Sequence, residues 1–365
     1  MLGPELRFID RDHVVLDGAK LLYLAGIDYH RMSHNPVIIQ SAVKAALQFG
    51  LSSTGSRATT GNHTLYIELE RTASEFFGSK GAVVLPSGYL SNTVVMQAIE
   101  SDFDAFFIDD ASHSSLFEAA SQLDKPLYRF NHLDPQSLEE QLKLHLAKRV
   151  KPLLLTDGVF PARGEMPPLK AYFEIMQRYD GKMLIDDAHA MAVIGQTGKG
   201  SWEAQGIDRK SLYQTGTLSK GFGVGGGMIP ADHDLVGKIH EKSLAFIGCT
   251  GLALPLAAAS IKSISYLMSN NHKILELQKR SLALKQKLLD IGFMMPNTPT
   301  PIFSVTHNDA DKNQRLKKIL IKNGIYPPFI HYPGSPEGGH FRFILTSSTT
   351  TDQETLLLET LESSL

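Results

Sequence analysis

Short apolar runs alternate with a helical pattern through the middle of the chain. The runs "GAVVLPSG", "DAFFIDD", "KPLLLTDG", "GKMLIDDAH" and "SLYQTG" are typical of buried strands, and "PLKAYFEIMQRYD" has the period of a helix between two of them. This alternation predicts an α/β fold built on a mostly parallel sheet flanked by helices.

Polar residues end most of these runs. The pairs are Ser87-Gly88, Asp109-Asp110, Thr156-Asp157 and Asp186-Asp187. They would lie at the carboxyl ends of strands, where open α/β sheets bind their ligands. We therefore expect the functional site at that edge.

The pattern changes after about Thr250 to long helical stretches, then short strands at "PIFSVTH" and "HFRFILTSS" and a closing helix. It predicts a smaller α+β domain. We expect an N-terminal segment over 1–45 that packs with this small domain, a large cofactor-binding domain over 46–248, and the small domain over 249–365.

Composition narrows the class of partner. The chain has 365 residues, is 42% hydrophobic and carries a net charge of −2. Because Lys and Arg are scattered, no nucleic acid or anionic membrane surface is expected as a partner. There is no apolar run long enough to span a bilayer and no signal-peptide core, and Cys249 is the single cysteine. A cytoplasmic enzyme with a small-molecule substrate is expected, with no metal site.

The stretch "TLSKGFGVGGG" contains Gly221, Gly223 and Gly226 in the spacing G-x-G-x-x-G. That spacing occurs in dinucleotide sites, but no acidic residue is convincingly placed after a following strand. The glycines could instead make room around Lys220.

Lys220 could form a Schiff base with an aldehyde cofactor once its amine loses its proton. Asp186 could hold a pyridine nitrogen protonated, and His189 follows three residues later. Taken singly, Asp186 could be a turn residue and Lys220 a solvated surface lysine. Their combination with the glycines favours a pyridoxal phosphate site.

Six motifs in order make the chain resemble the alpha-oxoamine synthases, and the resemblance runs from about Leu21 to the C-terminus. It implies the aspartate-aminotransferase fold (fold type I), pyridoxal phosphate, and a homodimer that joins a small amino acid to an acyl thioester, such as an acyl-CoA, with loss of carbon dioxide. The motifs are "GSRATTGNHTLYIELE", "LPSGYLSN", "DDASHSSLFEA", "TDGVFPARGEMPPL", "LIDDAHAMAVIGQTGKGS" and "TGTLSKGFGVGGG".

The resemblance assigns four catalytic roles. Lys220 matches the Schiff-base lysine, which is also the acid-base group at the alpha carbon. Asp186 matches the partner of the pyridine nitrogen, and His189 the group that bonds the phenolic oxygen. His113 matches the imidazole that stacks on the ring.

Phosphate binding is expected from the turn Ser87-Gly88-Tyr89, whose N–H groups open a helix, and from the hydroxyl of Thr217, with Ser219 as a weaker candidate. Tyr89 and Thr217 could equally be turn residues.

Two further residues concern the partner subunit and the substrate. Thr250 matches a residue that reaches the phosphate of the neighbouring subunit. Arg342 matches a clamp for the substrate carboxylate, and an arginine forms two parallel hydrogen bonds with such a group. The alternative for Arg342 is a half-exposed strand face.

The chain also departs from the family. "GIDYHRM" stands where the family has "SNDYLGL", so Ile27 replaces a polar residue and His30-Arg31 a small apolar pair. Pro161 replaces a serine, Tyr66 stands where histidine is common, and most of the family's extra N-terminal helix has no counterpart. The amino acid and the acyl donor stay open.

Three alternatives remain at this point. An aldolase or aminotransferase could use the same cofactor residues, since the ring chemistry is shared and the substrate shell decides. A non-catalytic partner subunit is disfavoured because Lys220, Asp186 and His189 are retained. The dinucleotide site is the least favoured.

Overall fold

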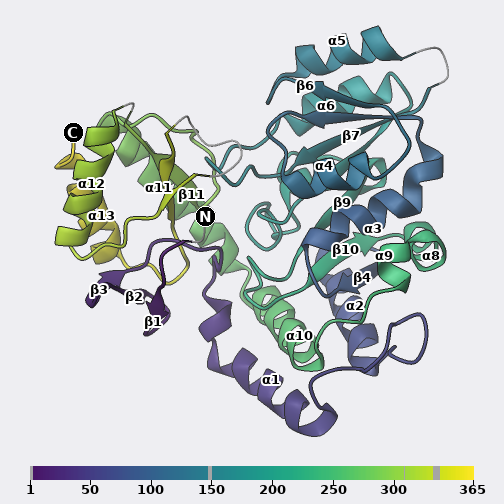
Figure 1. The fold of residues 1–365 in the computed structure, drawn as a ribbon, viewed down its shortest axis with the longest axis horizontal. Helices are drawn as coiled ribbons and strands as arrows, with labels where there is room; N and C mark the ends of the chain where they lie inside the picture. Colours follow the sequence, from purple (N-terminus) through teal and green to yellow (C-terminus); the bar gives the residue numbers. More distant parts are fainter. Residues whose placement is uncertain (1–2, 147–149, 308, 332–337) are drawn as a thin grey trace.

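The computed structural model describes residues 3–146, 150–307, 309–331 and 338–365 (Figure 1). A seven-stranded sheet forms the centre of the larger lobe, and β10 is its one antiparallel member, pairing with β4 and β9. The α/β prediction is confirmed. In spatial order the strands are β4 (Gly81–Leu85), β10 (Gly227–Ala231), β9 (Leu212–Thr217), β8 (Lys182–Asp186), β7 (Pro152–Asp157), β5 (Ala105–Asp109) and β6 (Leu127–Phe130).

Both faces of this sheet are covered, which explains why its strands read as continuous apolar runs. In β7, Leu153 and Leu155 pack with α3 (Tyr89–Ile99), α4 (Ser114–Ser121) and α8 (His233–Lys242). Leu154, between them, packs on the other face with α5 (Pro135–His145) and α6 (Leu169–Gln177).

A third helical layer lies beside β4. Helix α10 (Leu254–Ser269) packs against α1 (Pro36–Phe49) and α2 (Thr64–Phe77), and all three contribute to one apolar cluster. In Figure 1 these helices run along the bottom of the molecule.

The smaller lobe, on the left of Figure 1, holds a three-stranded antiparallel sheet in the order β11 (Ile302–Val305), β13 (His340–Ile344), β12 (Phe329–Ile330). Helices α11 (His272–Asp290), α12 (Ala310–Lys322) and α13 (Thr351–Glu362) pack with it in one core. In β13 both faces are covered, since Phe341 and Ile344 are each buried.

The N-terminal residues join this smaller lobe. Strands β1 (Arg7–Phe8), β2 (His13–Leu16) and β3 (Ala19–Leu22) form a meander whose end adds to the small-lobe core through Leu22 and Leu24. The Leu22 N–H donates to the Gly324 carbonyl at 2.7 Å, and the Ile344 N–H to the Leu24 carbonyl at 2.9 Å.

A buried lysine of the smaller lobe helps to join the two lobes. Lys285 of α11 is 1% exposed, and its Nζ donates to the Thr298 carbonyl at 3.0 Å and to the Thr300 hydroxyl at 3.0 Å. Both threonine hydroxyls donate in turn to the Gly164 carbonyl of the larger lobe. This Lys285 cluster, comprising Lys285, Thr298, Thr300 and Gly164, fastens the loop that follows β7.

Candidate active site

The predicted site residues gather at the carboxyl ends of β7, β8 and β9. Asp157 and Asp186 end β7 and β8 and are paired across the sheet, and Thr217 ends β9. Lys220 follows in the turn between β9 and β10. The sheet edge expected from the sequence is therefore the one that collects these side chains.

The glycines after Lys220 serve close packing of the backbone. Gly223 has a φ of +63°, and a Cβ there would lie 2.6 Å from the Asp28 Oδ1 atom. Val224 returns its N–H to the Leu218 carbonyl at 2.9 Å, which closes the turn. These contacts hold Lys220 between β9 and the N-terminal segment.

Lys220 has an unusually acidic ammonium group. Burial lowers its pKa to about 8, while the carboxylates of Asp186 and Asp157 act in the opposite direction and the charge of Arg342 adds to the lowering. A lysine with this pKa is about one tenth neutral at pH 7, far more than an ordinary lysine, which favours its use as a nucleophilic or proton-accepting amine.

Asp186 is fixed by an amide that the sequence reasoning missed. Asn92, fully buried in α3, donates from Nδ2 to the Asp186 Oδ2 atom at 2.7 Å, and the Ala188 N–H donates to Oδ1 at 3.0 Å. Asn92 accepts from the Thr215 hydroxyl at 2.6 Å. Asn92 is the last residue of the motif "LPSGYLSN". A single sequence contains no pattern that separates a functional asparagine at this position from a polar residue that only faces the core.

The neighbouring Asp187 points into a different network. It accepts from the Ser201 hydroxyl at 2.5 Å and from the Gln214 Nε2 group at 2.7 Å. Burial raises its pKa to about 7 against these hydrogen bonds. The two adjacent carboxyls thus have separate surroundings, and Asp186 is the one on the side of Lys220.

Asp157 is a buried carboxyl close to Asp186. Burial and the Asp186 charge raise the pKa of this carboxyl well above the usual range. It accepts the His113 N–H at 2.8 Å and thereby fixes the start of α4.

His113 caps α4. Its Nδ1 accepts the Ser115 N–H at 3.2 Å, and its ring meets the Tyr89 ring edge-on with centroids 5.9 Å apart. Burial lowers the pKa of this imidazole, with Asp186 opposing and Lys220 adding to the effect. A neutral imidazole is the form suited to packing on a ring.

His189 contacts Tyr29, which the sequence reasoning did not select. The Tyr29 hydroxyl lies 2.6 Å from Nδ1, and both side chains are buried. Burial lowers the pKa of His189 well below its usual value and raises that of Tyr29, so the imidazole is neutral and the phenol protonated. Among described residues this is the only hydrogen bond of the hydroxyl, and a phenol that donates to Nδ1 leaves the ring proton on Nε2.

The turn expected to bind phosphate lies against β9. A Cβ on Gly88 would come within 2.6 Å of the Thr217 Cβ, so only glycine lets the start of α3 approach this strand. Thr217 donates to the Gly226 carbonyl at 2.8 Å and accepts the Ser219 N–H at 3.1 Å. The Ser87 hydroxyl accepts the Tyr89 N–H at 3.3 Å.

Arg342 and Thr250 occupy different surroundings. Arg342 in β13 donates to the Gly26 carbonyl at 3.2 Å, and its charge acts on Lys220 and His189. Thr250 is exposed and pairs through its backbone with Ser56; within the described ranges no hydrogen bond joins its side chain to the other site residues.

The departures from the family motifs are accommodated by the fold. His30 is buried and bridges the lobes, with Nε2 2.7 Å from the Ala192 carbonyl and Nδ1 against the Ser347 hydroxyl. Tyr66 is buried and donates to the Leu252 carbonyl. Pro161 lies in the loop whose Ala162 carbonyl accepts from His340 at 2.9 Å.

The donor set fits pyridoxal phosphate. An aldehyde needs an amine that loses its proton near neutral pH, as Lys220 does. A pyridine nitrogen needs a fixed carboxylate, and Asn92 fixes Asp186. A phosphate needs backbone N–H groups at a helix start, and α3 begins at Tyr89 directly against Thr217.

Comparison with known proteins agrees with this chemistry. The family model described as aminotransferase class I and II matches residues 19–361. The 8-amino-7-oxononanoate synthase 1 of Bacillus velezensis is 30% identical over 96% of this chain and 90% of its own length. The Sphingomonas wittichii serine palmitoyltransferase structure is 26% identical, with a TM-score of 0.91 over 98% of this chain and 90% of that one.

A second structure adds the cofactor. A high-resolution structure of SPT, serine palmitoyltransferase, with PLP is 25% identical and has a TM-score of 0.90, covering 98% of this chain and 90% of that one.

Proposed function

This chain belongs to the class I and II aminotransferase family and, within it, to the alpha-oxoamine synthases, and from that premise we propose how its own residues carry the reaction. It is a pyridoxal-phosphate-dependent acyltransferase that condenses an amino acid with an acyl thioester, with loss of carbon dioxide. The residue assignments, the substrate size and the assembly are our proposal.

The proposal rests chiefly on the buried Lys220 amine beside Asp186. When bound, pyridoxal phosphate supplies an electron sink for charge that develops at the substrate alpha carbon. Lys220, with its pKa lowered to about 8, exchanges a proton at that carbon. Asp186 keeps its charge directed at the pyridine nitrogen because Asn92 and the Ala188 N–H hold both its oxygens.

His189 and His113 set the position of the ring. The neutral His189 would offer an Nε2 proton to the phenolic oxygen of a bound cofactor, because Tyr29 occupies its Nδ1. His113 is held from both sides, by Asp157 at its backbone and Ser115 at its Nδ1, and provides a fixed flat surface. The bond that breaks can then stand across the plane of the ring.

Arg342 is the proposed partner of the substrate carboxylate. Its charge already acts on Lys220 and His189, so a carboxylate bound there would lie beside the reacting carbon. We propose a small amino acid as substrate. The relative from Bacillus velezensis is named an 8-amino-7-oxononanoate synthase, and the departures at Ile27, His30 and Pro161 alter the surroundings in which this chain selects its acyl group.

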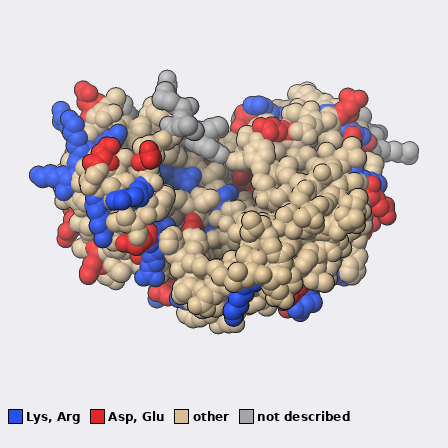
Figure 2. All heavy atoms as spheres, turned by 60° about the horizontal axis from the view of Figure 1, so that its bottom comes forward, with Lys and Arg blue, Asp and Glu red and all other residues tan. Residues whose placement is uncertain are grey.

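We propose that the enzyme is a two-fold homodimer. On α1, Ile39, Val43 and Leu47 are spaced four residues apart and exposed, Leu47 by 85%. This stripe belongs to the layer of α1, α2 and α10, and Figure 2, turned to bring the bottom of Figure 1 forward, shows a broad face with few charges. A second copy of the chain packed on this face would place its own exposed Thr250 beside the active site of the first copy, as the resemblance implies.

The proposed location is the cytoplasm. No helix within the described residues is long and apolar enough to cross a membrane. The single cysteine, Cys249, is free, which suits a reducing compartment.

The decisive experiment counts products. With a suitable small amino acid alone, the holoenzyme should exchange the alpha proton with deuterium from solvent, because that step needs Lys220 but no second substrate. Carbon dioxide and free thiol should appear one for one when an acyl thioester is added. Carbon dioxide release, or amino transfer to a keto acid, at full rate without a thioester would contradict the proposal and identify another pyridoxal phosphate reaction.

A further inference from the structure

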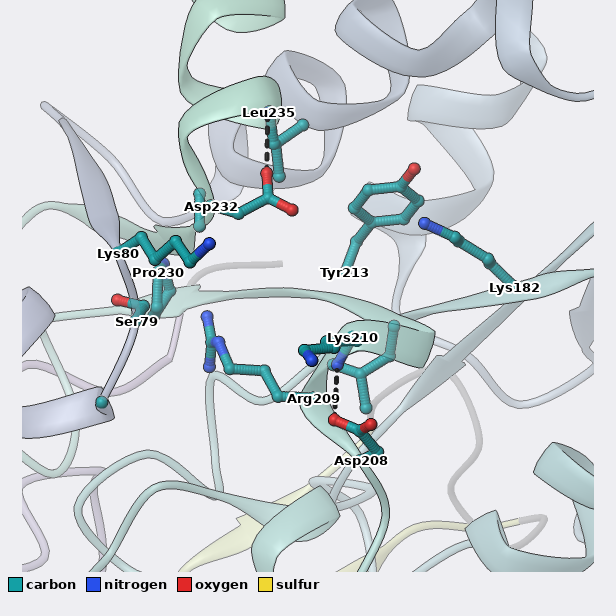
Figure 3. A pocket seen from close by; sticks show the side chains of 13 residues that line it. Ser79, Lys80, Lys182, Asp208, Arg209, Lys210, Tyr213, Pro230, Asp232 and Leu235 are labelled. Carbon is teal, nitrogen blue, oxygen red and sulfur yellow. Dashed lines mark hydrogen bonds between the residues drawn. The ribbon is translucent and has the colours of Figure 1, made fainter.

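A second pocket lies at the edge of the central sheet opposite Lys220 (Figure 3). Strands β4, β8 and β9 begin at this edge and β10 ends there, so the lining comes from the segments just before or after these strands. The cavity measures about 500 Å³, within the range of small-molecule sites. None of its lining residues belongs to the proposed active site.

Four cationic side chains line this rear pocket. Lys80 precedes β4, Lys182 begins β8, and Arg209 and Lys210 lie in the short helix η3 (Arg209–Ser211) before β9. Four cations against the two lining carboxylates, Asp208 and Asp232, leave a formal excess of two positive charges. The net charge of the whole chain is −2, so this excess is local.

The two carboxylates are already used as helix caps. Asp208 accepts the Lys210 N–H at 3.0 Å, and Asp232 accepts the Leu235 N–H at 2.9 Å. Within the described part of the chain, none of the four cations forms an ion pair within 4.0 Å. The four cations therefore lack a carboxylate in direct contact, although the charges of Asp187 and Asp232 act on Arg209 from further away.

Arg209 is held in place without a carboxylate partner. Its Nη1 donates to the Gln214 Oε1 atom at 2.9 Å, and Gln214 is itself held by Asp187 at 2.7 Å. The guanidinium also lies over the Trp202 ring, 5.6 Å from the centroid. No hydrogen bond within the described residues uses Nε or Nη2, and in Figure 3 the guanidinium and the Lys80 ammonium reach into the same space.

Part of the lining is apolar. Leu212, Leu235 and Pro230 contribute carbon surface, and Tyr213 contributes a ring with the Lys182 Nζ atom 5.0 Å from its centroid. A bare inorganic anion would leave this surface without a partner. A molecule that joins an anionic group to an organic part would use both.

We propose that the rear pocket binds a small phosphorylated organic molecule, with its phosphoryl group between Arg209 and Lys80 and its organic part toward Tyr213. An arginine fork already fixed by Gln214 matches the oxygen geometry of a phosphoryl group. Lys182 and Lys210 add charge around the same cavity. This site lies outside the proposed acyltransferase chemistry and does not depend on it.

Calorimetric titration of the holoenzyme tests the proposal, because bound cofactor already fills the other phosphate site. The probes are ADP, as a phosphorylated organic molecule, and inorganic pyrophosphate. We expect saturable binding of both that weakens with added salt, with ADP the tighter. Equal affinity for the two would overturn the assignment of the organic part.

Matched charge variants locate the binding. The double variant K80Q/K210Q changes exposed side chains that donate no described hydrogen bond, and K317Q/K318Q makes the same charge change on α12. Affinity for ADP should fall roughly tenfold in K80Q/K210Q and stay within about twofold in K317Q/K318Q. Unchanged affinity in K80Q/K210Q would place ADP elsewhere, such as a thioester site, and overturn the proposal.

Discussion

The proton on His189 is controlled by a residue from the far end of the sequence. The Tyr29 hydroxyl lies 2.6 Å from Nδ1, and when it donates there Nε2 is left as the donor. Neither residue alone determines this tautomer, since a neutral imidazole without a partner exchanges between its two forms. Tyr29 is thus a positioning residue for the proposed cofactor contact.

Replacing Tyr29 by phenylalanine should therefore allow the His189 ring proton to exchange between Nδ1 and Nε2. We expect the pH midpoint of the absorbance change of the lysine-bound cofactor to rise, because the phenolic oxygen loses a fixed hydrogen bond that favours its ionised form. The rate should fall about tenfold, equivalent to one hydrogen bond of about 1.4 kcal/mol.

The control for Tyr29 is Tyr172→Phe, which removes a buried hydroxyl that has no described partner. Its absorbance midpoint and rate should match the wild type. An unchanged midpoint in Tyr29→Phe would show that Tyr29 serves packing alone.

Asp186 and Asp187 can be separated in the same way. Asp186→Asn removes the charge aimed at the pyridine nitrogen while keeping the shape, so alpha-proton exchange should fall at least about a hundredfold, on the order of 3 kcal/mol. Asp187→Asn should change exchange only a few-fold, because Asp187 faces Ser201 and Gln214. Proton NMR in deuterated buffer measures the rate of alpha-proton exchange. A larger loss of rate in Asp187→Asn than in Asp186→Asn would show that the assignment is wrong.

At the scale of elements, the Lys285 cluster joins α11 to the loop after β7. Burial lowers the pKa of Lys285 to about 7. In the unfolded chain the lysine has its ordinary pKa near 10.4, so between these values the unfolded state binds more protons. The free energy of unfolding contributed by this group therefore rises with pH from about 7 to about 10.

Lys285→Met removes this dependence. Between pH 7 and pH 9 the free energy of unfolding of the wild type should gain about 2 kcal/mol relative to the variant. Denaturant unfolding at both pH values measures it, with the exposed Lys287→Met, two residues further along α11, as the control that keeps the wild-type slope. A wild-type slope equal to that of Lys285→Met would mean that Lys285 stays charged when buried.

Elements with a strong repeating pattern could be predicted from the sequence. The long helical pattern expected after about Thr250 begins with α10, whose sequence is "LPLAAASIKSISYLMS", and the predicted strand run "GKMLIDDAH" contains β8 with Asp186 at its end. β10 was missed because Gly227 and Pro230 disfavour a strand, and it forms because β4 and β9 pair with it on both sides. Pairing with β4 and β9 therefore outweighed the low strand propensity of the β10 segment.

The residues of the candidate site likewise fall into those that the sequence could predict and those that it could not. Lys220, Asp186, His189 and His113 lie in local motifs, and the structure brings them to one sheet edge. Tyr29 and Asn92 could not be selected, because their contacts join segments 160 and 94 residues apart. A single sequence does not show which distant segments meet in space, because such contacts depend on how whole layers of the fold pack together.

For the whole molecule, the exposed stripe on α1 makes assembly testable. Leu47→Glu places a charge where a second copy would cover an apolar side chain, so the dimer should dissociate and retain less cofactor. Leu144→Glu, on the distant and 72% exposed Leu144 of α5, should leave both unchanged. Light scattering with cofactor absorbance checks this, and a wild-type monomer with full cofactor would rule out shared sites.

The contacts of the N-terminal segment have a consequence for biosynthesis. Leu22 pairs with the backbone at Gly324 and Tyr326, the Ile344 N–H reaches the Leu24 carbonyl, and His30 bonds to Ser347. A ribosome delivers those partners about three hundred residues after the N-terminus. The contacts that tie Leu22, Leu24 and His30 to the smaller lobe therefore form only after most of the chain has been synthesised.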